Sequence, residues 1–243
     1  MSLFLINTIF ILIRKSLMEI LHMLPNVPLR LVLKFHKQIR EEITEKYCEE
    51  FVNQGWSGNI ERVKELLELG VDINCPAQKG ATILTQASYH GHLKLVSFLI
   101  ENKADVNKSR NDGTTPLFNA CQAGNYWIVH KLIENGADVM AKRNDSTTCL
   151  YIACYFGFVN IVDFLLKYKA DTNVLRNDKS TPLFIAAYLG HFDIVKNLIK
   201  ENADINQSNH YGFTPLSIAN IHEYANISEL LRNELKKMEN ENK

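Results

Sequence analysis

A period of 33 residues runs through most of this 243-residue chain and limits the folds it can adopt. Glycine recurs at positions 58, 91, 124, 157 and 190, and aspartate at 72, 105, 138, 171 and 204. Threonine keeps the same spacing at 82, 115, 148, 181 and 214. A unit this short cannot bury its apolar face alone, so each unit must stack on its neighbours. The period therefore predicts an array of stacked units rather than one globular core.

Each unit is predicted to contain two short helices. Thr115-Pro116 is typical of a helix start, because the threonine oxygen caps free N–H groups and proline suits the first helical position. Gly124 is expected to end the first helix in a left-handed conformation. Lys103 and Lys169 stand where a glycine would end the second helix, and each should cost about 1 kcal/mol if it adopts that conformation.

The segment DGTTPLFNACQAGNYWIVHKLIENGADV at 112–139 closely resembles an ankyrin repeat, and the resemblance covers about residues 42–235. It implies an all-α ankyrin-repeat solenoid of stacked helix-turn-helix units linked by β-hairpin-like turns. The expected repeats are 42–74, 75–107, 108–140, 141–173, 174–206 and 207–235, of which the first and last are atypical and resemble caps. Residues 1–41 are assigned to an apolar, partly helical extension and 236–243 to a polar tail.

The N-terminal run Leu3–Ile13 is almost wholly apolar and is followed by Arg14 and Lys15. Eleven residues are too few to cross a bilayer, which needs about 20. A secretory signal would carry its positive charge before the apolar run. We therefore expect an extension or a packed helix; membrane contact through residues 3–24, or a true start at Met18 or Met23, remains open.

Charge and motif content argue against several functional classes. Lysine plus arginine equal aspartate plus glutamate at 27 each, so no general attraction to nucleic acid is expected. The five cysteines form no Cys-x-x-Cys pair, which favours a reducing compartment: the cytoplasm, with the nucleus open. The chain lacks a phosphate-binding glycine loop, a His-Glu-x-x-His motif and a nucleophile elbow. We expect a monomeric, non-enzymatic protein without cofactor, metal or small-molecule substrate.

The resemblance implies that the residues just before each repeated glycine line a concave side of the array. In this chain they are Tyr89, His90, Gln122, Tyr155, Phe156, Tyr188 and Leu189, with Ile152 and Ile185 one helical step back. Repeats four and five should thus expose a contiguous apolar and aromatic patch, which is typical of a partner-binding site. The alternative is that the tyrosines only fill the groove between repeats.

The turns carry a second pattern, the triplet Arg-Asn-Asp at 110–112, 143–145 and 176–178. One hypothesis is that Arg110, Arg143 and Arg176 bind acidic groups of a partner. The other is that each arginine pairs with an aspartate of an adjacent turn, an exposed pair contributing about 0–1 kcal/mol.

The sequence therefore predicts a protein-protein interaction module, a scaffold or adaptor that binds another protein on its concave face. Three alternatives stay open: a substrate-recognition subunit of a ubiquitin ligase, a membrane-tethered ankyrin protein, and a host-directed effector. The first rests on the run from Thr148 to Tyr155, which faintly resembles repeats of the feminisation-type receptors.

Overall fold

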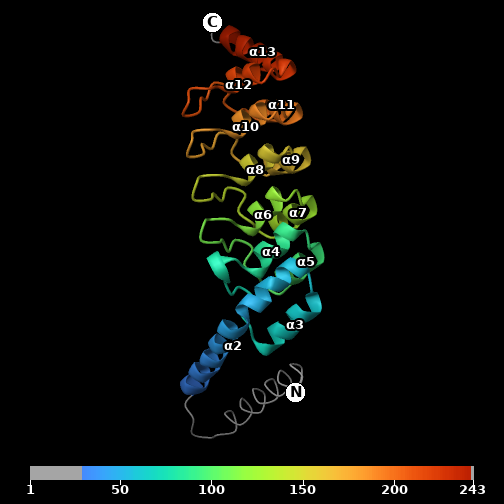
Figure 1. Cartoon of the computed structure of the whole chain (residues 1–243), viewed down its shortest axis with the longest axis vertical. Coiled ribbons are helices and arrows are strands. Elements are labelled where there is room, and N and C mark those ends of the chain that lie inside the picture. Colours follow the sequence, from blue (N-terminus) through green and yellow to red (C-terminus); the bar gives the residue numbers. More distant parts are fainter. Residues whose placement is uncertain (1–28, 242–243) are drawn as a thin grey trace. The chain divides into compact units, whose positions relative to one another are not determined.

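The computed structural model describes residues 29–241, and every regular element within that range is a helix. The chain divides into two compact units, of which the first ends at Asp105 and the second begins at Val106. The first unit contains, in chain order, α2 (Leu29–Ser57), α3 (Ile60–Leu69), the 3-10 turn η1 (Gln78–Gly80), α4 (Ile83–His90) and α5 (Leu93–Glu101) (Figure 1). Within it, α2 packs against both α3 and α4, and α4 packs against α5.

The second unit is a stack of four helix pairs. Its first helices are α6 (Pro116–Gln122), α8 (Cys149–Phe156), α10 (Pro182–Tyr188) and α12 (Pro215–Ile221). Its second helices are α7 (Tyr126–Glu134), α9 (Val159–Lys167), α11 (Phe192–Lys200) and α13 (Ala225–Glu241). First helices pack on first helices and second on second along the stack (Figure 1). The predicted period, helix pairs and stacking are confirmed.

Threonine caps begin the first helices, as predicted. The side chains of Thr115, Thr148 and Thr181 each accept a hydrogen bond from the backbone N–H three residues later. Thr82 and Thr214 also form reciprocal capping boxes. The leucines two residues after four of these caps are buried, so each of these caps fixes the point at which the chain enters the core; they are Leu84, Leu117, Leu150 and Leu183.

Helix α2 departs from this pattern because the first repeat has Glu49 where later repeats have the capping threonine. Nothing stops the helix there, and it extends toward the N-terminus as far as Leu29. It therefore crosses the expected boundary between residues 41 and 42. At the other end, α13 runs to Glu241, so most of the expected polar tail is helical. The apolar run Leu3–Ile13 and the possible membrane contact through residues 3–24 lie outside the described residues.

The turns between repeats are hairpin-like. Arg110, Arg143 and Arg176 each donate a backbone hydrogen bond to the carbonyl four residues later, at 2.9, 3.0 and 3.1 Å. An isolated antiparallel bridge joins Lys142 and Thr148. Neighbouring turns are also joined, because Asn144 N–H donates to the Asp112 carbonyl at 3.0 Å and Asn177 N–H to the Asp145 carbonyl at 3.2 Å. The expected β-hairpin-like linkers are confirmed.

Two lysines adopt the left-handed conformation that the sequence indicated. Lys103 has φ 67° and Lys169 has φ 60°, where Gly136 has φ 86°. All three residues lie directly after a second helix. Because lysine has a Cβ and glycine does not, the backbone is strained at Lys103 and Lys169.

Candidate protein-binding surface

Helices α8 and α10 of the second unit end in four large side chains that reach solvent. Tyr155 is 45% exposed, Phe156 44% and Tyr188 40%, and Leu189 is half-buried. The rings of Tyr155 and Phe156 meet edge to face, with centroids 5.0 Å apart. These residues come from equivalent positions of adjacent repeats whose first helices pack together. The predicted apolar patch is therefore present on the second unit.

One predicted member of the patch is wrong. Ile185 is only 7% exposed, so it belongs to the core, while Ile152, one repeat earlier, is half-buried. Both lie one helical step before the exposed tyrosines, at the margin of the apolar stripe. The sequence spacing placed them on the outer face, whereas α10 packs against both α8 and α12 and Ile185 is buried.

The patch continues onto α12, beyond the residues that the sequence predicted. Ile221 and His222 occupy the same register at the end of α12, and Ile221 is exposed. The ring of His222 lies 4.7 Å from that of Tyr188. We call Tyr155, Phe156, Tyr188, Leu189, Ile221 and His222 the first-helix surface. Continuing the 33-residue register by one repeat would have found its last two members.

The first unit carries its own aromatic cluster. Tyr89 and His90 lie at the end of α4. Trp56, near the end of α2, occupies the position of Tyr89 one repeat earlier and is exposed, but was not predicted from the sequence. The rings of Trp56 and His90 stack with centroids 5.2 Å apart and an interplanar angle of 5°. Burial lowers the pKa of His90, and the nearby His92 lowers it further.

Gln122, predicted as a contact, is half-buried at the end of α6.

A second set of rings, directly after the repeated glycines, is structural. A Cβ placed on Gly124 would lie 2.7 Å from the ring of Phe158, and one on Gly157 would lie 2.7 Å from the ring of His191. Each ring therefore rests on the glycine of the preceding repeat. His92 also forms a hydrogen bond of 2.6 Å through Nε2 with the backbone carbonyl of Trp56. His92 and His191 therefore help to hold adjacent repeats together at these turns.

The arginines of the turns are engaged within the protein. Arg143 lies 3.3 Å from Asp112 and 5.3 Å from the ring centre of Phe118. Arg176 lies 3.7 Å from Asp145 of the preceding turn and 3.3 Å from Asp178. The structure thus supports the pairing hypothesis for both arginines. Arg110 is half-buried, and its Nε has no hydrogen-bond partner among the described residues.

The aspartates of these turns titrate at lower pH than usual. Partial burial would raise the pKa of Asp112, Asp145 and Asp178. Hydrogen bonds from the residue two positions later, Thr114, Thr147 or Ser180, together with the arginine charges, outweigh burial and lower each pKa. The turns therefore favour the ionised carboxylates that hold the arginines.

The second helices present a further aromatic cluster, which the sequence reading did not identify. Trp127 is 67% exposed on α7, beside Tyr126, at a ring-centroid distance of 5.3 Å. His130 of α7 stacks on Phe164 of α9 at 4.9 Å and lies 3.1 Å from Glu134. Tyr168, directly after α9, extends the cluster, because its ring lies 4.9 Å from that of Phe164 and it is 41% exposed.

Within residues 29–241, no group of three histidine, cysteine or acidic side chains is arranged to hold a metal ion. No helix in the same range combines the length and apolar character needed to cross a bilayer.

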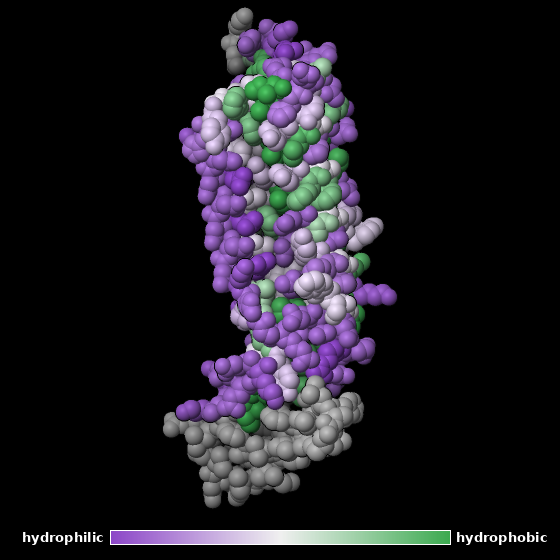
Figure 2. All heavy atoms as spheres, in the orientation of Figure 1, coloured by the Kyte–Doolittle hydropathy of each residue, from purple (hydrophilic) through white to green (hydrophobic). Residues whose placement is uncertain are grey.

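On the face shown in Figure 2, the turns of the second unit form a hydrophilic edge, and hydrophobic residues lie over its helices.

Two family models match most of the repeat array. A family model described as ankyrin repeats (3 copies) matches residues 54–143 and 150–242, and a second, described as ankyrin repeats (many copies), matches 125–166. The chain belongs to the ankyrin-repeat family. Ankyrin repeats are generic protein-protein interaction modules, and the family is typically non-catalytic. No curated protein matches the chain.

Proposed function

We propose that this ankyrin-repeat protein is a scaffold or adaptor that binds a partner protein through the first-helix surface of its second unit. The supporting observation is a row of large apolar side chains on α8, α10 and α12, presented by a rigid stack. Exposed aromatic residues close together are typical of interface anchors. A preorganised surface also loses little conformational entropy on binding.

The turn arginines contribute less to this proposal. Their charges are balanced by Asp112, Asp145 and Asp178, so a partner would have to displace an existing ion pair to reach Arg143 or Arg176. We therefore assign partner affinity mainly to apolar contacts of the first-helix surface and expect weak dependence on salt.

The protein itself supplies the reference for a test, because Gln122 and Ala123 occupy on α6 the positions that Tyr155 and Phe156 occupy on α8. The test variant carries Tyr155→Gln, Phe156→Ala, Tyr188→Gln and Leu189→Ala, so each new residue already occurs natively in the equivalent place. A crosslinking pull-down identifies partners of the full chain, and titration of the purified partner gives the affinity. We expect the fourfold variant to lose at least about 100-fold in affinity, as anchor residues do.

A matched control is Trp127→Ala, which removes a more exposed aromatic side chain from a second helix. It should bind like the wild type. Equal binding by the fourfold variant, with an unchanged circular dichroism spectrum, would refute the proposal. Partner identity also decides among the alternatives, since a cullin adaptor would indicate a ubiquitin-ligase receptor.

A further inference from the structure

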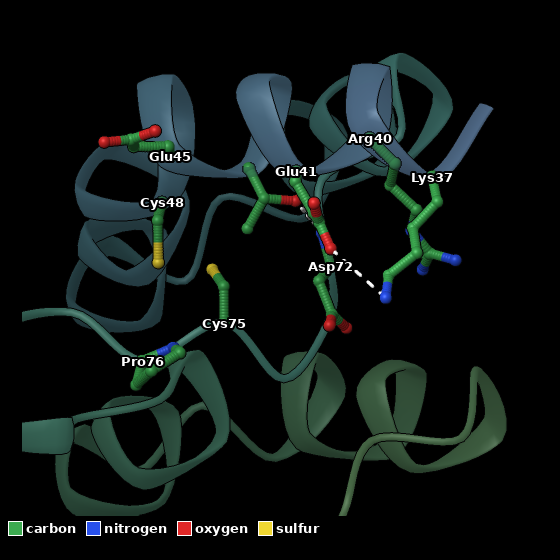
Figure 3. Close-up of a pocket in the computed structure, with 9 residues that line it drawn as sticks. Lys37, Arg40, Glu41, Glu45, Cys48, Asp72, Cys75 and Pro76 are labelled. Atoms are coloured by element: carbon green, nitrogen blue, oxygen red, sulfur yellow. Dashed lines mark hydrogen bonds and ion pairs between the residues drawn. The ribbon is translucent and has the colours of Figure 1, made fainter. Parts of the chain in front are cut away.

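A cavity of about 490 Å³ opens between α2 and the turn that follows α3 in the first unit. Its wall contains two thiols, Cys48 from α2 and Cys75 from the turn, which point toward one another (Figure 3). Lys37, Arg40 and Asp72 lie farther along the same cavity. Solvent therefore has a route to a pair of neighbouring cysteines.

A second cysteine pair in the chain offers an internal comparison. Cys121 and Cys149 of the second unit also interact through their side chains, but both are fully buried. Cys48 keeps 8% of its surface exposed and Cys75 keeps 2%, and both line the cavity. Access, rather than proximity, distinguishes the two pairs.

The two thiols at the cavity are not equivalent. Burial raises the pKa of both, and most strongly that of Cys75. The neighbouring Cys75 side chain partly offsets the increase in the pKa of Cys48, whereas Cys48 raises the pKa of Cys75 further. Cys48 is the more exposed of the two thiols, so a molecule that enters the cavity reaches its sulfur first. Thiolate character and access together select the sulfur that reacts first.

We propose that Cys48 and Cys75 are an oxidation site, at which a peroxide entering the cavity converts the two thiols to a disulfide. The Cys48 thiolate attacks the O–O bond of hydrogen peroxide, forming a sulfenic acid and a hydroxide that takes up the released proton. The Cys75 sulfur then attacks the Cys48 sulfur, and the sulfenic hydroxyl leaves with the Cys75 proton as water. Two thiols are oxidised and one peroxide is reduced to two waters.

The bond would join α2 to the turn that leads into η1, enclosing α3 in a covalent loop. Such a loop restricts the unfolded chain and so raises the stability of the first unit. Because burial keeps both sulfurs mainly as thiols, the reaction is expected to be slow and to need peroxide in excess.

The test uses the full reduced chain treated with hydrogen peroxide, then alkylated under denaturing conditions and digested without reductant. We expect a peptide pair joined through Cys48 and Cys75, formed at least about tenfold faster than any product of Cys121 or Cys149 because access governs the rate. Dithiothreitol should reverse it. Oxidation of Cys121 and Cys149 at the same rate, or free Cys48 and Cys75 after prolonged treatment, would overturn the proposal.

Two single variants separate the chemical steps. Cys75→Ser should stop the reaction at a sulfenic acid on Cys48, detected with a dimedone-type reagent, whereas Cys149→Ser should form the disulfide like the wild type. Thermal unfolding of the wild type should shift upward after oxidation and return after reduction. An unchanged midpoint despite complete crosslinking would exclude the stabilising role, and an untrapped Cys48 in a folded Cys75→Ser protein would exclude Cys48 as the attacking sulfur.

Discussion

The turn edge and the first-helix surface of the second unit arise from the same repeat and differ in how their side chains are satisfied. At the turns, each aspartate accepts hydrogen bonds from its own turn, and Arg143 and Arg176 pair with aspartates of the preceding turns. On the first-helix surface, Tyr155, Phe156 and Ile221 leave much of their apolar area in water. The charged groups of the turn edge are paired within the protein. The first-helix surface leaves apolar area in water, which a bound partner would cover.

This difference separates stability from recognition. Changes at the turns should lower the free energy of unfolding and leave partner affinity nearly intact. Substitutions on the first-helix surface should do the reverse, except where a side chain or glycine also supports the next repeat.

The largest loss of stability is expected at Gly157. This glycine directly follows Phe156 of the first-helix surface and also supports the next repeat. Gly157→Ala puts a Cβ 2.7 Å from the ring of His191 at a residue with φ +76°. Steric overlap adds to left-handed strain, so we expect about 2–4 kcal/mol of destabilisation in urea unfolding. Gly136→Ala is the control, because its Cβ meets nothing within 4 Å and only the backbone strain remains. Equal losses in both variants would show that the ring contact is unimportant.

A smaller loss is expected at the turn edge itself. Asp145→Ala removes the acceptor for the Thr147 N–H at 3.1 Å and a carboxylate partner of Arg176. We expect about 1–2 kcal/mol of destabilisation, as for a lost side-chain cap near a charged group. Partner affinity should stay within about twofold of the wild type by the same reasoning that exposed ion pairs contribute little. Substitution of the exposed Lys142 by alanine is the control. A large loss of affinity in Asp145→Ala would show that the turns belong to the partner-binding surface.

Acid should weaken the turn edge selectively. The pKa values of Asp112, Asp145 and Asp178 are lowered in the folded protein, so the unfolded chain takes up protons first as the pH falls. The stabilisation is therefore complete above the usual aspartate pKa of about 4 and is lost as the pH falls below it. Urea midpoints at neutral and acidic pH measure this loss. A variant with all three aspartates changed to asparagine should lose less stability on acidification, and an equal loss would assign the effect elsewhere.

The smallest effect is a gain. Lys169→Gly relieves a side chain held at φ 60° after α9, and should add about 0.5–1 kcal/mol once the greater freedom of glycine in the unfolded chain is subtracted. Lys167→Gly, at the last residue of α9, relieves no left-handed strain and should not stabilise the protein. If Lys169→Gly also destabilises the protein, the lysine side chain makes a compensating contact.

Local chemistry made most of the fold predictable. The threonine of each repeat predicted the starts of the first helices, and the left-handed conformations of Lys103 and Lys169 followed from the register alone. Choices between spatial neighbours were not predictable. Whether Arg176 meets a partner or Asp145, and whether Ile185 is covered, depends on the angle at which adjacent repeats pack. The length of α2 depends on the absence of a cap, which is a weaker signal than its presence.

The rings that rest on glycines make every joint in the second unit directional. The repeat nearer the N-terminus supplies a bare backbone at Gly124, Gly157 or Gly190, and the next one supplies the ring. A unit cut out or duplicated at the 33-residue register would carry one half of each joint with it, and the ends left behind would still be complementary. The length of the array is therefore free to change by whole units without redesign of any seam, which is how such a protein can be resized for a larger or smaller partner.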